Sequence, residues 1–176
     1  MFNILRPLIF KFSPEVAHSL AIKALKLNNI PYSKPKDNHI LETTFCEKKL
    51  SSPIGVAAGF DKNAEVYNPL FNLGFGFVEV GTITPKPQFG NPKPRVFRLE
   101  EDEALINRLG FNNSGSEQIS QTIKENNKKG FLGINIGPNK DSKDRVEDYL
   151  ICFRKFYNLA DYITCLLYTS PSPRDS

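Results

Sequence analysis

The stretch IGVAAGFDKN, residues 54–63, joins a short apolar run to a glycine and a lysine. The run Ile54–Ala58 has the length of a β-strand without polar alternation, which is typical of a strand covered on both faces. The small residues Ala57 to Gly59 would let the backbone approach a flat ligand closely, and Lys62 would supply a cation there. We therefore predict a parallel sheet with ligand-binding groups at the C-terminal ends of its strands.

Further apolar runs of strand length alternate with helical patterns. The predicted strands are Gly74–Val80, Phe131–Ile136 and Asp161–Thr164, and a hairpin is expected over Leu41–Leu50. The predicted helices cover Ala64–Leu73, Glu117–Lys128 and a third segment around Tyr149–Tyr157. Strands that alternate with helices predict βαβ units and an α/β fold. About four such steps correspond to the N-terminal half of a (β/α)₈ barrel, which usually needs ~250 residues, whereas the chain has 176.

Unusual segments follow each predicted strand. GTITP, residues 81–85, opens a loop that runs to Asn113, and GINIG, residues 133–137, closes the third strand. The loop contains KPRVFR, residues 93–98, and NRLGFNN, residues 107–113. Amides both donate and accept, so the second motif suits a planar heterocycle with alternating C=O and N–H groups. Each segment alone fits an ordinary turn or core amide, and their repeated placement after successive strands favours a site.

Residues 1–30 predict two short amphipathic helices. Ser13 and Pro14 separate them, because Ser is a preferred N-cap and Pro is tolerated in the first turn. The second helix places on one side Val16, Ala17, Leu20, Ala21, Ala24 and Leu27. Residues 1–36 hold six Lys or Arg against Glu15 alone, a net charge of +5. Two interpretations stay open: a helical cap on its own domain, or a hairpin that lies on an anionic membrane surface.

Composition and charge exclude several classes. With 40% hydrophobic and 24% charged residues the chain is a globular protein with a core. Outside the N-terminus the charges nearly balance, which argues against a nucleic-acid face, and a solvated basic loop is the favoured interpretation of residues 93–98. Three dispersed cysteines and two histidines offer no metal-ligand cluster. No apolar run reaches the ~20 residues of a membrane-spanning helix, and no secretory signal is recognisable.

Taken together, five motifs closely resemble the class 2, quinone-linked dihydroorotate dehydrogenases over residues 1 to about 164. The motifs are AAGFDKN (57–63), GTITPKPQ (81–88), KPRVFR (93–98), NRLGFNN (107–113) and GINIG (133–137). The N-terminal helical pair distinguishes this class from the soluble classes. The resemblance implies oxidation of dihydroorotate to orotate in de novo pyrimidine biosynthesis, with hydride transfer to FMN and electron transfer to a membrane quinone. It also implies a peripheral membrane protein on the cytoplasmic face of the bacterial inner membrane.

The resemblance assigns expected roles residue by residue. FMN would contact Ala58, Gly59, Phe60, Asp61, Lys62, Thr82 and Asn135. The substrate, dihydroorotate or orotate, would contact Lys62, Asn107, Arg108, Leu109, Gly110 and Phe111. The quinone site would include His18 and Arg98. A cation near the flavin would stabilise the charge of the reduced cofactor, and amides would bind the orotate ring edge.

We expect three parts in the chain. Residues 1–38 form the amphipathic helical hairpin and linker, residues 39–164 form an incomplete FMN-binding barrel, and residues 165–176 read as a non-native, adapter-derived tail. The family's serine base would follow the fourth strand, where this tail stands instead, so we expect no catalytic residue in the chain and no turnover by it. The alternatives are another FMN-dependent barrel oxidoreductase, which the NRLGFNN motif disfavours, and a non-catalytic membrane-surface module.

Overall fold

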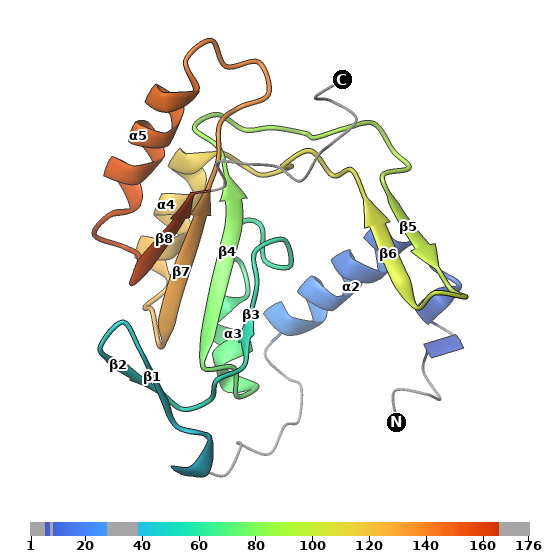
Figure 1. Ribbon diagram of the computed structural model, residues 1–176. Helices are drawn as coiled ribbons and strands as arrows, with labels where there is room; N and C mark the ends of the chain where they lie inside the picture. The colour runs from blue at the N-terminus through green and yellow to red at the C-terminus, as the bar shows by residue number, and fades with distance from the viewer. Residues whose placement is uncertain (1–5, 8, 28–38, 166–176) are drawn as a thin grey trace.

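The computed structural model describes residues 6–7, 9–27 and 39–165. Its centre is a four-stranded parallel sheet in the order β3, β4, β7, β8 (Figure 1). The strands are Gly55–Val56 (β3), Phe77–Ile83 (β4), Phe131–Ile136 (β7) and Tyr162–Cys165 (β8). The connecting helices are Tyr67–Asn72 (α3), Ser116–Glu125 (α4) and Arg145–Phe156 (α5). The alternation of strands and helices confirms the predicted α/β class.

The core lies between the sheet and the three connecting helices, which cover one of its faces (Figure 1). Every residue of β7 is buried, which explains why this central strand is apolar along most of its length. On the helix side, Ile119 and Ile123 of α4 are buried one turn apart, as an amphipathic helix requires. Helix α5 begins at a capping residue, because the Asp144 carboxylate accepts the backbone N–H of Glu147 at 3.0 Å.

A hairpin covers the N-terminal ends of the strands. After a short 3₁₀ turn at His39–Leu41, Thr43–Phe45 (β1) pairs with Lys48–Leu50 (β2) in antiparallel register. The ring of Phe45 contacts three aromatic side chains at the start of β4, β7 and β8: Phe77, Phe131 and Tyr162, with centroids 5.8 to 6.3 Å away. This end of the sheet is therefore filled by side chains, and the opposite end carries the polar segments.

Helix α2, Pro14–Lys26, packs against the fold with one face only. Ile22 and Leu25 are buried in the core, whereas Val16 and Leu20 are each 47% exposed. The inner face of α2 therefore packs on the fold, and most of the predicted apolar side points away from the core, so both interpretations stay open. Ser13 occupies the N-cap position without a side-chain hydrogen bond to the helix. The described residues 6, 7, 9 and 10 are also helical; residues 1–5 and the predicted linker lie outside the described residues.

Several element bounds differ from the sequence prediction, and one hairpin was not predicted. Strand β4 starts three residues later than expected, because Gly74, with φ +99°, ends the turn after α3. The predicted loop after β4 contains an antiparallel hairpin, Val96–Leu99 (β5) and Ala104–Asn107 (β6), which stands beside α2 (Figure 1). Arg95, just before this hairpin, is only 7% exposed, so the solvated-loop interpretation is wrong for this residue.

The described C-terminal end belongs to the sheet. Cys165, the first residue of the predicted tail, pairs with Ile136 at the end of β8. Residues 166–176 lie outside the description. Among the described helices, none is long and apolar enough to cross a membrane.

Candidate functional site

The C-terminal ends of β3 and β4 are joined by backbone hydrogen bonds. The N–H of Gly59 donates to the carbonyl of Gly81 at 2.8 Å, and the N–H of Gly81 donates to the carbonyl of Asp61 at 3.1 Å. Gly81 has φ +113°, and a Cβ there would lie 2.5 Å from the carbonyl oxygen of Asn135. Only glycine fits this position, because any side chain would separate β4 from β7. The predicted cofactor segments are therefore brought together at one end of the sheet.

Thr82 and Asn135, two predicted cofactor residues, contact each other across β4 and β7. The Thr82 hydroxyl donates to Asn135 Oδ1 at 2.7 Å, and Asn135 Nδ2 donates to Glu79 Oε1 at 3.0 Å. The other oxygen of Glu79 accepts the hydroxyl of Thr164 at 3.0 Å. Glu79 thus fixes the orientation of the Asn135 amide. Sequence reasoning missed this residue, although a lone charge inside the apolar run FVEV, residues 77–80, was the visible signal.

The Asp61 side chain serves the local turn. It is fully buried, and its two oxygens accept the backbone N–H groups of Glu65 and Val66, each at 2.8 Å. Burial raises the pKa of this carboxyl, and the backbone hydrogen bonds offset part of that increase. The Asp61 side chain therefore holds the segment before α3 in place, and its predicted role in cofactor binding stays a prediction.

Lys62 is the cation at this end of the sheet. Its Nζ donates to the carbonyl of Gly59 at 2.5 Å. Burial lowers the pKa of Lys62, nearby Arg95 lowers it further, and Glu15 and Asp61 act in the opposite direction. A partly desolvated ammonium group beside few competing anions is suited to attract the carboxylate of a small ligand.

The predicted substrate segment, Asn107–Phe111, leaves the end of β6 and turns toward the sheet. Gly110 and Phe111 both have positive φ, +73° and +51°, which places the segment in a tight turn. Asn113 braces it, because this buried amide donates to the carbonyl of Phe111 and to the hydroxyl of Thr84 at 2.8 and 2.9 Å. Asn113 is therefore a buried amide with its hydrogen bonds satisfied. This is the ordinary core-amide role, which the sequence left open as an alternative to ligand binding.

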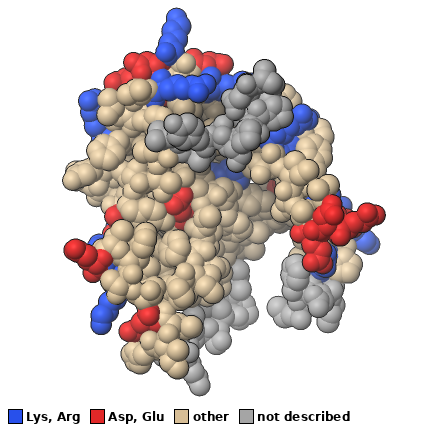
Figure 2. Space-filling model, viewed as in Figure 1, with Lys and Arg blue, Asp and Glu red and all other residues tan. Residues whose placement is uncertain are grey.

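A cavity of about 660 Å³ lies between α2, the β5–β6 hairpin and the end of β3. Some of the predicted site residues line this cavity, namely Gly59, Phe60, Lys62, Asn107, Leu109, His18 and Arg98. The other predicted residues do not line it: Ala58, Asp61, Thr82, Asn135, Arg108, Gly110 and Phe111. Figure 2 shows the surface hollowed between the sheet and the hairpin, with acidic side chains gathered where the hairpin turns at residues 100–103.

Both predicted quinone residues reach this cavity from α2 and β5. His18 Nε2 donates to the carbonyl of Phe60 at 2.7 Å, and its ring meets the Phe60 ring edge-on at 5.3 Å. Arg98 Nη1 donates to the carbonyls of Phe10 and Phe12 at 3.3 and 2.8 Å, and its guanidinium lies 4.5 Å from the centre of the Phe10 ring. The α2 side of the cavity therefore carries His18 and Arg98 together with acidic and basic side chains of α2, among them Glu15 and Lys23.

The residues present fit a flat, polar cofactor with a small ligand beside it. Apart from Gly59 and its two chain neighbours, no heavy atom of the described residues lies within 4 Å of where a Cβ of Gly59 would stand, so a planar group could approach this backbone. Asn112, which lines the cavity, has a buried Oδ1 without a hydrogen-bond partner among the described residues. A buried acceptor left unpaired is unusual in native structures and fits a donor supplied by a ligand. Sequence reasoning had not singled out Asn112 from the amide motif.

Comparison with known proteins gives a consistent result. The sequence model of the dihydroorotate dehydrogenase family matches residues 40–172. A Bartonella henselae protein named dihydroorotate dehydrogenase (quinone) is 49% identical over 168 residues, which are 96% of this chain and 46% of that protein. A Rhizobium etli protein of the same name is 48% identical over 165 residues, 94% of this chain and 46% of its own length.

Solved structures agree with the sequence comparison. The ligand-free DHODH of Eimeria tenella superposes with a TM-score of 0.82 at 40% identity, over 87% of this chain and 45% of that chain. The ferulenol complex of the Eimeria tenella enzyme gives a TM-score of 0.81 over 87% of this chain and 43% of that chain. The prediction of about half of a (β/α)₈ barrel is confirmed, and the chain spans about half the length of the curated relatives it matches. The chain therefore belongs to the dihydroorotate dehydrogenase family.

Proposed function

We propose that a protein containing this chain oxidises dihydroorotate to orotate in pyrimidine biosynthesis, with FMN as cofactor and a membrane quinone as electron acceptor. The chain spans about half the length of its curated relatives, so the proposal concerns the protein of which these residues form a part. The observation that carries it is the cavity that brings Lys62 and Asn107 together with His18 and Arg98. The names of the relatives support the substrate and the acceptor.

The residues at the ends of β3, β4 and β7 would hold FMN. We assign this role to the backbone of Ala58 to Asp61, to Lys62, and to the hydrogen-bonded pair Thr82 and Asn135. When bound, FMN supplies the hydride acceptor of the reaction. Glu79 would support the cofactor indirectly, because it fixes the Asn135 amide.

The substrate would lie between Lys62 and the segment Asn107–Phe111. Lys62 offers an ammonium group for the orotate carboxylate, and the amide of Asn107 and the free acceptor of Asn112 offer partners for the ring N–H and C=O groups. A fixed cation there would also favour the negative charge that FMN would carry after accepting a hydride. We assign no catalytic base among the described residues.

The quinone would enter on the α2 side of the cavity. His18 and Arg98 would contact its head group, and the exposed apolar side chains of α2, such as Val16 and Leu20, would lie against the lipid. The net charge of +5 on residues 1–36 favours an anionic membrane surface. We propose a peripheral location on the cytoplasmic face of the bacterial inner membrane.

The experiment uses a full-length protein that contains this chain. Orotate formation is followed with a short-chain quinone as acceptor and, in parallel, with NAD. We expect turnover with the quinone only. We also expect the substitution Arg98→Ala to slow electron transfer to the quinone more than it slows flavin reduction by dihydroorotate. A protein that binds FMN but oxidises no dihydroorotate with either acceptor would favour another FMN-dependent oxidoreductase. Absence of bound FMN would favour a non-catalytic membrane module.

A further inference from the structure

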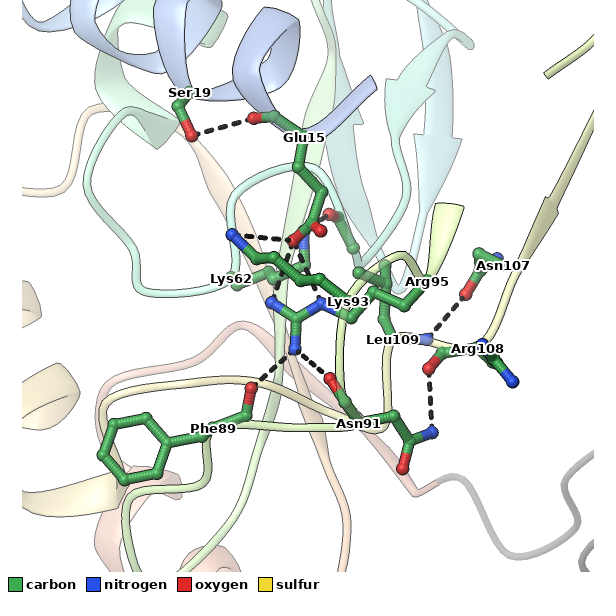
Figure 3. A network of polar contacts seen from close by, with 11 residues as sticks. Glu15, Ser19, Lys62, Phe89, Asn91, Lys93, Arg95, Asn107, Arg108 and Leu109 are labelled. Carbon is green, nitrogen blue, oxygen red and sulfur yellow. Dashed lines mark hydrogen bonds and ion pairs between the residues drawn. The ribbon is translucent and has the colours of Figure 1, made fainter. Parts of the chain in front are cut away.

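Arg95 connects helix α2 to the loop that precedes the β5–β6 hairpin. Its Nε and Nη2 donate to Glu15 Oε1 at 3.0 and 2.8 Å (Figure 3). Its Nη1 donates to the backbone carbonyls of Phe89 and Asn91 at 2.6 and 3.1 Å. The Arg95 side chain is almost entirely buried, so these bonds are shielded from water.

Asn91 continues the connection to the proposed substrate segment. Its backbone N–H donates to the carbonyl of Leu109 at 3.0 Å, and its side-chain Nδ2 donates to the carbonyl of Arg108 at 2.8 Å. The N–H of Arg108 donates in turn to the carbonyl of Arg95 at 2.9 Å. Three hydrogen bonds of the turn after β6 therefore end on Arg95 or on a residue that Arg95 binds. Figure 3 shows the one between Asn91 and Arg108.

The two chain segments also lie too close together to shift independently. A Cβ at Gly90 would stand 2.2 Å from the carbonyl oxygen of Leu109, and a Cβ at Gly110 would stand 3.0 Å from the backbone nitrogen of Asn91. Both glycines have positive φ, +78° and +73°. The loop at Phe89–Asn91 and the substrate segment therefore form one packed unit, and its position depends on where Arg95 is held.

Glu15 supplies the fixed end of this connection. It is the only acidic residue in residues 1–36, and it points from the first turn of α2 to Arg95, with Lys93 3.9 Å from the same oxygen. An acid at a helix N-terminus is favoured by the helix dipole. A buried guanidinium requires its partner, because a charge left unpaired there is costly. The helix therefore determines where the Arg95 guanidinium lies.

We propose that the Glu15–Arg95 ion pair is a positioning device, through which helix α2 sets the place of the substrate segment Asn107–Phe111. The inference rests on the proposed function only for naming that segment as the substrate site. Glu15 and Arg95 are positioning residues, since they act on the ligand through Asn91 and Leu109. One consequence is that the helix on the quinone side and the proposed substrate turn are mechanically connected.

The first test is hydrogen exchange on a full-length protein that contains this chain. Glu15→Gln removes the charge that holds Arg95 and keeps the side-chain size. We expect the amides of Asn91 and Arg108 to exchange about tenfold faster or more, while the amides of β4 and β7 keep their protection. The matched control is Glu65→Gln, which removes the partner of Lys26 in the second ion pair of α2. It should leave residues 88–113 unchanged.

A second variant distinguishes the loss of these loop contacts from general unfolding. Arg95→Lys keeps a cation for Glu15 but cannot bind Phe89 and Asn91 at the same time, so the same two amides should lose protection while α2 stays docked. Unchanged exchange of Asn91 and Arg108 in both variants, or an equal effect of Glu65→Gln, would overturn the proposal.

The substrate side is tested separately in a full-length protein with FMN. Glu15→Gln should raise the KM for dihydroorotate about tenfold with little change in kcat, and Glu15→Asp should recover part of the loss. A purely structural role would lower the amount of active enzyme without moving KM. If the wild type does not use dihydroorotate at all, the proposed function fails, and the exchange experiment still decides whether the ion pair positions the turn.

Discussion

Replacement of Asp61 by Asn tests whether this side chain serves the fold or a ligand. In the structure its two oxygens accept the N–H groups of Glu65 and Val66, and the side chain is fully buried. The Asn amide can accept only one of these N–H groups, and its NH₂ would face the other. An unsatisfied buried donor costs about 1–3 kcal/mol. Removal of a buried carboxylate, whose pKa is raised by burial, offsets part of that cost.

We therefore expect Asp61→Asn to lower the free energy of unfolding by about 1–2 kcal/mol, and Asp61→Ala, which leaves both N–H groups unpaired, to lower it roughly twice as much. Urea denaturation at neutral pH measures both values. In a full-length protein that contains this chain, the FMN affinity of the folded fraction should change little in Asp61→Asn. A variant of unchanged stability with much weaker FMN binding would refute the structural role and assign the carboxylate to the cofactor.

Two further predictions concern pH and the membrane. Burial raises the pKa of Asp161, but hydrogen bonds from Lys128, Leu132 and Lys48 lower it more, so the pKa lies below its usual value. The charged Asp161 should therefore stabilise the fold at neutral pH, and this contribution to the free energy of unfolding should be lost as the pH falls below about 4. Unfolding at several pH values should show Asp161→Asn less stable at pH 7 and closer to wild type in acid, and a constant difference would contradict this. Replacement of the exposed Val16 and Leu20 by Ser should weaken binding to anionic vesicles by about tenfold or more without unfolding the protein, and undiminished binding in a vesicle sedimentation assay would count against a lipid-facing α2.

The sheet could be predicted from sequence where burial is complete. β7 is buried at each position, so its apolar run Phe131–Ile136 coincides with the strand. The sequence predicted a longer strand, Ile54–Ala58, than the observed β3, Gly55–Val56. The strand is shorter because the small residues after it leave the sheet to form the turn at Gly59. Helix α5 was recognised by its apolar spacing, but its start at Arg145 depends on the Asp144 cap, which periodicity alone does not reveal.

Contacts between distant segments were not predictable from local patterns. The β5–β6 hairpin is partly exposed and apolar on both faces, so it lacks the alternation that marks a strand. Arg95 appeared as part of a basic loop because its partner, Glu15, lies 80 residues earlier in the chain. Glu79 and Asn135 are 56 residues apart and meet only through the register of β4 and β7. The motifs located the ends of the strands, and the pairings between them required the fold.

Flavin reduction by dihydroorotate tests the central claim most directly. A full-length protein that contains this chain is loaded with FMN, kept anaerobic and mixed with dihydroorotate in a stopped-flow instrument. We predict that the absorbance of oxidised flavin disappears and that an equivalent amount of orotate forms. Lys62→Met, which removes the ammonium group but keeps much of the side-chain volume, should slow this step by ~10²–10³ while FMN stays bound. Flavin that remains oxidised in the wild type, or bleaches equally fast in Lys62→Met, would contradict the account.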